Sequence, residues 1–89
     1  MEITQEQAKV IIEIHQEALN VAQLDEDLMT STGIIGGHPA TFRVWVWSRE
    51  TNESLIQEDA FIDADLFSDE LNKALYLLRN LRRELEVNA

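Results

Sequence analysis

The clearest structural pattern in the chain lies in residues 41–62, TFRVWVWSRETNESLIQEDAFI. Its first seven residues are aromatic or β-branched apart from Arg43, a composition typical of a strand. Residues 50–53 favour a hairpin turn, and residues 55–62 then return as a second strand whose apolar pattern is interrupted by acids. We therefore predict an antiparallel hairpin at the centre of the chain.

Successive side chains of a strand point to opposite faces of its sheet, so the first strand of this hairpin has two distinct faces. One face is wholly apolar and the other combines two tryptophans with an arginine: Phe42, Val44 and Val46 against Arg43, Trp45 and Trp47. Because both faces are largely apolar, we expect the strand to be covered on both sides.

Helices are predicted before and after the hairpin. Thr4 and Gln7 form a capping-box pattern, so the first helix should begin at Gln5 and continue to about Leu28. Its apolar residues fill two adjoining stripes, which one sheet alone cannot cover in a domain of 89 residues. The second helix should begin near Ser68, with Asp65 as a rival cap a few residues earlier.

Residues 30–39 contain all three glycines and the single proline, so we predict that they form the main irregular connection. The expected fold class is α+β: a helix–β-hairpin–helix unit (αββα), with two helices packed on a small antiparallel sheet, completed by oligomerisation. The length fits a single domain over residues 1–89.

Composition limits the partners and the location. Seventeen acids face seven bases, a net charge of −10, which repels phosphate backbones and anionic membranes. We therefore expect no direct nucleic-acid partner and no membrane partner.

With no cysteine, disulfides and thiolate zinc sites are excluded. No signal peptide or membrane span is apparent, so the cytoplasm is the expected location.

The glycine-containing connection is the first candidate for a small-ligand site. Hydroxyls and open backbone there define a possible ligand loop of Thr32, Gly33, Gly36, Gly37 and His38. It lacks the Lys-Ser/Thr pair of a phosphate-binding loop, and the alternative is a helix C-cap at Gly33 followed by a turn.

Metal binding and catalysis find little support in the sequence. His15 and His38, with the acids at 25–27, have no metal-ligand spacing, and a core position for His15 is the alternative. Residues 63–70 look like a calcium loop but lack its glycine and its distal glutamate, so they are better explained as helix-start acids. No nucleophile elbow or His-Glu-x-x-His pair is present. We expect no cofactor, no metal and no enzymatic activity.

Partner binding is the better supported expectation. Tryptophan and arginine anchor many protein interfaces, so Arg43, Trp45 and Trp47 are candidate contacts, the alternative being that the tryptophans pack under a helix of the same chain. Between Arg49 and Lys73 there are eight acids and no base. The acidic candidates for partner contacts are Glu53, Glu58, Asp59, Asp63 and Asp65.

Three functions follow from these features. The first is a non-enzymatic, homo-oligomeric module, most simply a dimer, that binds another protein. The second is an acidic nucleic-acid mimic that occupies a basic groove of a partner, comparable in size and charge only to small inhibitors of phages and mobile elements. The third is a protein that sequesters a small ligand in the glycine segment. Steep salt dependence of binding would distinguish the mimic from the module.

Overall fold

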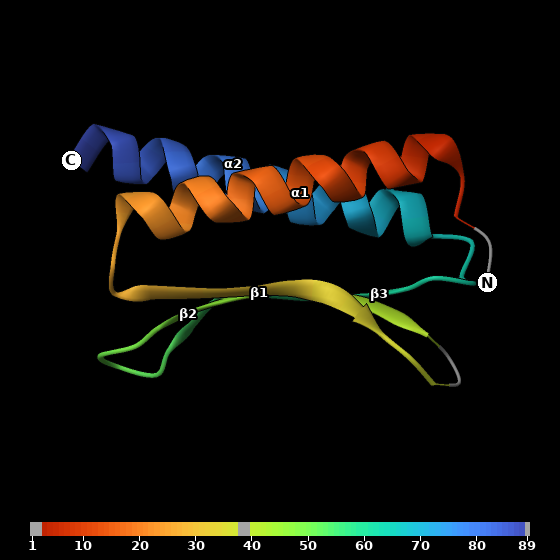
Figure 1. The fold of residues 1–89 in the computed structure, drawn as a ribbon, viewed down its shortest axis with the longest axis horizontal. Helices are drawn as coiled ribbons and strands as arrows, with labels where there is room; N and C mark the ends of the chain where they lie inside the picture. Colours follow the sequence, from red (N-terminus) through yellow and green to blue (C-terminus); the bar gives the residue numbers. More distant parts are fainter. Residues whose placement is uncertain (1–2, 38–39, 89) are drawn as a thin grey trace.

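The computed structural model describes residues 3–37 and 40–88, which form two helices and three strands (Figure 1). Their order is α1 (Gln5–Leu24), β1 (Leu28–Ile35), β2 (Thr41–Ser48), β3 (Ser54–Phe61) and α2 (Phe67–Asn88). The strands form an antiparallel meander in the spatial order β1-β2-β3, and both helices cover the same face of it (Figure 1). The predicted α+β class, with two helices packed on a small antiparallel sheet, is confirmed.

Strand β1 departs from the sequence-based expectation. The first helix ends at Leu24, and residues 28–35 pair with β2 in continuous register from Leu28 opposite Ser48 to Ile35 opposite Thr41. The predictions of a helix to about residue 28 and of an irregular connection over residues 30–39 are therefore wrong. Neither hydrophobic alternation nor aromatic content marks this segment, and it is strand because β2 offers it a ladder of hydrogen bonds.

The start of α1 is the predicted capping box. The Thr4 hydroxyl accepts a hydrogen bond from the Gln7 amide at 3.1 Å, and the Gln7 side-chain oxygen accepts one from the Thr4 amide at 3.0 Å. The start of α2 differs slightly from expectation, because Phe67 precedes Ser68 in the helix. The Ser68 hydroxyl instead accepts a hydrogen bond from the Gln7 side-chain amide at 2.9 Å, which joins the first turns of the two helices.

The two helices run parallel to each other (Figure 1). In a three-stranded meander β1 and β3 point the same way, so the helix before β1 and the helix after β3 must share the opposite direction. Two ion pairs connect the helices, Arg79 to Glu13 at 3.2 Å and Arg82 to Glu17 at 2.8 Å. Glu17 is only 9% exposed, and this hydrogen bond is the main cause of the raised pKa of Arg82.

The core lies between the helix layer and the sheet. Strand β2 shows this most clearly, because every second residue from Phe42 to Ser48 is buried beneath the helices. The largest fully buried side chains come from α1, α2 and β2: Phe42, Phe67, Ile14, Leu71, Leu78, Val21, Val44 and Val46. In the described part of the chain, no helix lies over the opposite face of the sheet. None of the helices in the described part of the chain is long and apolar enough to cross a membrane.

Candidate protein-binding surface

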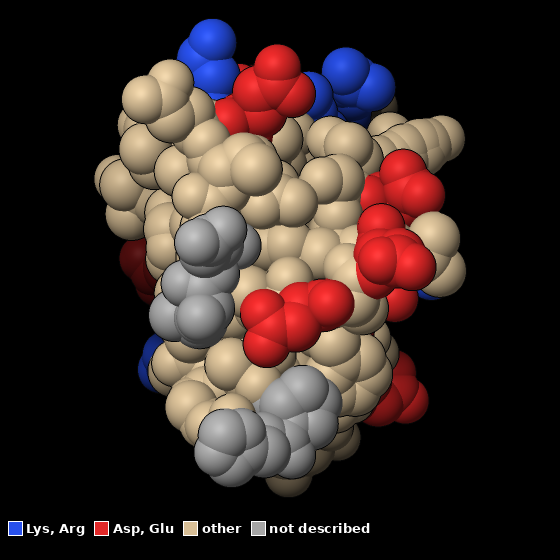
Figure 2. Space-filling view, turned by 90° about the vertical axis from the view of Figure 1, so that its right-hand side faces the viewer, with Lys and Arg blue, Asp and Glu red and all other residues tan. Residues whose placement is uncertain are grey.

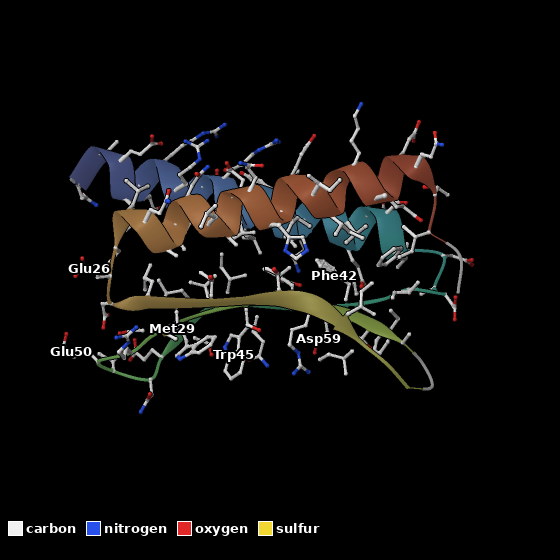
Figure 3. All side chains as sticks on the ribbon, viewed as in Figure 1. Glu26, Met29, Phe42, Trp45, Glu50 and Asp59 are labelled. Carbon is white, nitrogen blue, oxygen red and sulfur yellow. The ribbon has the colours of Figure 1, made fainter. Side chains whose placement is uncertain are left out.

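The side of the sheet that the two helices leave uncovered is open to a partner. We call it the open face, and the register of the strands defines its members: Met29, Ser31, Gly33, Ile35, Thr41, Arg43, Trp45, Trp47, Ser54, Gln57, Asp59 and Phe61. In Figure 3 the labelled side chains of Met29, Trp45 and Asp59 extend from the sheet away from the helices, whereas Phe42 lies between the two layers.

The tryptophans are the most prominent side chains of the open face. Trp45 and Trp47 are two residues apart on one strand, so their rings lie side by side, with centroids 4.5 Å apart and planes inclined by 37°. The indole N–H of Trp45 donates to the Ser54 hydroxyl at 2.8 Å, and both rings are half-buried. The alternative that this pair packs under a helix of the same chain is wrong, because both helices cover the other face.

Beside the tryptophans lies an ion pair between neighbouring strands. Arg43 on β2 is opposite Asp59 on β3, and its guanidinium donates to both carboxylate oxygens, at 2.8 and 3.3 Å. This hydrogen bonding raises the pKa of Arg43. Arg43 and Asp59 are the only charged residues among the twelve of the open face and their charges cancel, while the guanidinium of Arg49 reaches the sulfur of Met29 at 2.8 Å. The open face is therefore not acidic, although the chain has a net charge of −10.

The predicted acidic residues do not gather on one surface. Glu53 lies in the β2–β3 turn, whereas Asp63 and Asp65 follow β3 at the other end of the sheet, about 25 Å away along an eight-residue strand. Glu58 points toward the helix side and pairs with Lys73 at 3.4 Å. Figure 2 looks onto the end of the molecule shown at the right of Figure 1, where acidic side chains are separated by uncharged surface.

The predicted ligand loop is likewise divided. Thr32 and Gly33 are part of β1, opposite Val44 and Arg43, while Gly36 and Gly37 follow the strand and His38 lies outside the described residues. The Thr32 hydroxyl is hydrogen-bonded to Nδ1 of His15 at 2.5 Å. The His15 side chain is exposed beside β1, so the expectation that it packs in the core is wrong. The C-cap expected at Gly33 is wrong too, because Asp25 caps the helix.

Asp27, which was considered above only together with Asp25 and Glu26, joins the end of β2 to the start of β1. The Asp27 carboxylate accepts hydrogen bonds from the Ser48 hydroxyl at 2.6 Å and from the Glu50 amide at 2.9 Å. These bonds, the Ser48 bond first, lower the pKa of Asp27. No signal in the sequence predicts them, because they depend on β1 pairing with β2. Within residues 3–37 and 40–88 no cluster of His, Asp and Glu could hold a metal ion.

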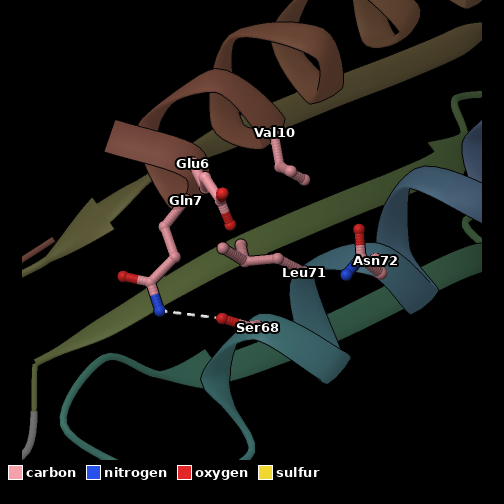
Figure 4. A pocket seen from close by; sticks show the side chains of 6 residues that line it. All are labelled: Glu6, Gln7, Val10, Ser68, Leu71 and Asn72. Atoms are coloured by element: carbon pink, nitrogen blue, oxygen red, sulfur yellow. Dashed lines mark hydrogen bonds between the residues drawn. The ribbon is translucent and has the colours of Figure 1, made fainter. Parts of the chain in front are cut away.

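A small cleft lies between the first turns of the two helices (Figure 4). Its volume is about 220 Å³, and its lining mixes polar with aliphatic side chains: Glu6, Gln7, Val10, Ser68, Leu71 and Asn72. The hydrogen bond between Gln7 and Ser68 crosses one side of it (Figure 4). The cleft is smaller than a typical ligand pocket, and among the described residues that line it Glu6 is the one titratable group.

Comparison with known proteins gives no relative. No protein-family model matches the chain, and no curated protein and no solved structure is significantly similar to it. The class of the protein is therefore defined by its own geometry: an α+β domain with two parallel helices on one face of a three-stranded sheet and a pair of tryptophans on the other.

Proposed function

We propose that this chain is a non-enzymatic, homo-oligomeric protein-interaction module that binds another protein through the open face. The observation that carries the proposal is the pair of adjacent tryptophans on a sheet face that no helix covers. Tryptophan and arginine dominate the binding energy of protein interfaces because they bury large, rigid or planar groups. Exposed Ile35 and Phe61 extend the apolar area on either side of Thr41.

The charge of the open face supports a partner that it meets by apolar contact. The charges of Arg43 and Asp59 cancel, and Arg49 contacts Met29 of this face, so a partner's polar rim would meet these groups beside the aromatic rings. The surrounding net charge of −10 then excludes acidic competitors through long-range repulsion. Such a module needs no cofactor.

The two other functions have less support from the geometry. A nucleic-acid mimic needs a continuous row of carboxylates, but the candidate acids are divided between two ends of β3, and two of them form ion pairs with Arg43 and Lys73. A sequestering loop needs residues that surround a ligand, but Thr32 and Gly33 belong to a paired strand.

The proposal is tested by capturing partners with open-face variants. Trp47→Ser removes one ring, and Gln57→Lys places a charge beside Trp45 without removing a core contact. Tyr76→Lys on α2 is the matched control, because Tyr76 is 58% exposed on the helix layer. A protein retained by the wild type and by Tyr76→Lys, and lost with both open-face variants, supports the module. Equal capture by all four proteins, each shown to be folded by circular dichroism, contradicts it.

The mimic is tested on the same captured partner. Changing Glu53, Glu58 and Asp63 to their amides removes three carboxylates from outside the open face. For the module we expect affinity to change little with this triple variant and with salt between 50 and about 500 mM, because buried apolar contacts are not screened. A steep fall in affinity under both treatments would favour the mimic.

A further inference from the structure

The outer edge of β1 is a row of backbone groups that face away from the sheet. The amide of Arg49 donates to the carbonyl of Asp27 at 2.8 Å, so residues 27 and 49 form a hydrogen-bonded pair. Antiparallel pairs alternate between bonded and non-bonded, so Thr30, Thr32 and Ile34 direct their N–H and C=O groups outward. Within the described residues, no hydrogen bond from outside the sheet reaches these groups.

The two edges of the sheet are built differently. Strand β3 is interrupted by a bulge opposite Val46 and Trp47, and it carries Glu58 and Asp59, both features by which proteins prevent further strand pairing. Strand β1 has eight residues without a charge, and its register with β2 has no irregularity. One edge is protected and the other is suited to pairing.

Helix α1 lies above β1, so one side of this helix faces the same direction as the outer edge of the strand. The His15–Thr32 hydrogen bond shows which side of α1 lies above β1. Residues three, four or seven positions from His15 along a helix share its side, and those that continue this stripe are small or apolar: Ala8, Ile12, Leu19 and Ala22. Ile12 is 63% exposed and Leu19 is 53% exposed. Ala8 and Ala22, each two turns from His15, are small enough to permit the close approach of another helix at both ends of this stripe.

The residues before and after β1 differ in charge. This difference determines in which direction a second copy of the chain could pair with the strand. Asp25, Glu26 and Asp27 precede the strand, whereas the uncharged Gly36 and Gly37 follow it. A second copy that paired in parallel would place acids beside acids. Antiparallel pairing places the acids of each copy beside the glycines of the other, and it also makes the two α1 dipoles antiparallel.

We propose that β1 pairs antiparallel with β1 of a second copy of this chain, about a two-fold axis near Thr32, to give a continuous six-stranded sheet. The His15–Thr32 bond places the midpoint of the α1 stripe above the midpoint of the strand, so one axis serves both layers. The same arrangement leaves the open face of each copy free. The inference rests on the self-association in the proposed function and assigns it a surface.

Matched proline variants at the two edges test this pairing by sedimentation at micromolar concentration. Thr30→Pro removes an outward N–H from β1, and Gln57→Pro removes an outward N–H from β3, so neither breaks the ladder within the chain. We expect a wild-type particle of twice the 10.2 kDa chain mass. Thr30→Pro should raise the dimer Kd at least about tenfold, because each dimer loses two hydrogen bonds. Gln57→Pro should leave it unchanged.

Two further measurements keep the test decisive if Thr30→Pro fails to fold. Leu19→Lys should weaken the dimer, whereas Tyr76→Lys on the other helix should not. In the wild type, amide exchange at Thr30, Thr32 and Ile34 should slow as the protein concentration rises. A monomer at hundreds of micromolar, or a dimer that persists in Thr30→Pro and Leu19→Lys, overturns the inference.

The same variants distinguish a failure of the proposed dimer from a failure of the proposed partner binding. A dimer that dissociates with Trp47→Ser but not with Leu19→Lys would place self-association on the open face, which overturns the edge pairing. Loss of partner capture by the open-face variants, in a chain that is monomeric throughout, would overturn the inference while the binding surface stands.

Discussion

The two faces of β2 should differ sharply in what they contribute to the stability of the isolated chain. Phe42 and Trp45 lie three residues apart on this strand, but Phe42 is 1% exposed beneath the helices and Trp45 is half-buried on the open face. Phe42→Ala leaves a cavity in a close-packed core and should lower the free energy of unfolding by about 3–5 kcal/mol.

For Trp45→Ala the contacts in the structure give a smaller loss. The contact with the Trp47 ring contributes about 0.5–1.5 kcal/mol, and the hydrogen bond to Ser54 contributes about 0.5–1.5 kcal/mol. These two contributions sum to about 1–3 kcal/mol, and the apolar area lost from a half-buried ring adds a smaller amount. Trp45→Phe and Ser54→Ala should each remove the hydrogen bond, and their double variant should cost no more than their sum.

Urea unfolding followed by far-ultraviolet circular dichroism measures these losses. It should be repeated at several protein concentrations, because self-association adds to apparent stability. Tyr76→Ala is the control and should change stability by less than about 0.5 kcal/mol, since its ring is exposed. If Trp45→Ala costs as much as Phe42→Ala at every concentration, the open face is covered in the isolated protein and the reasoning from the structure fails.

Three further predictions concern single side chains. Thr4→Ala should lower the free energy of unfolding by about 1 kcal/mol, seen as a fall in Tm, because the Gln7 amide loses its acceptor; an unchanged Tm would show that the capping box contributes nothing. Gly33→Ala should raise stability by about 0.5–1 kcal/mol, since Gly33 is within a strand and an added Cβ meets no atom within 4 Å; a large loss would point to a tightly approached backbone there. Asp27 has a lowered pKa in the folded state, so its contribution is present above the unfolded pKa of 3.8 and is lost as the pH falls through the folded value. The stability difference between wild type and Asp27→Asn should therefore be constant at neutral pH and narrow below pH 3.8, and a difference independent of pH down to pH 2 would contradict this role.

Features that depend on near neighbours in the chain could be predicted from the amino-acid sequence. The capping box is formed by residues three positions apart, so its two hydrogen bonds follow from local geometry. The hairpin of β2 and β3 follows from composition and a turn, and the period of two places Arg43, Trp45 and Trp47 on one face whatever covers it. The class of the fold and the candidate aromatic surface were therefore predictable.

Other features depend on which helices and strands come into contact in the folded chain. Strand β1 has a composition that suits several conformations, and it is extended because β2 pairs with it over eight residues. The two apolar faces of β2 look alike in the sequence, and the direction of the meander puts both helices over Phe42 and leaves Trp45 uncovered. Register pairs Arg43 with Asp59, and strand length separates Glu53 from Asp63. These outcomes are set by contacts between residues far apart in the chain, which local propensity and periodicity do not encode.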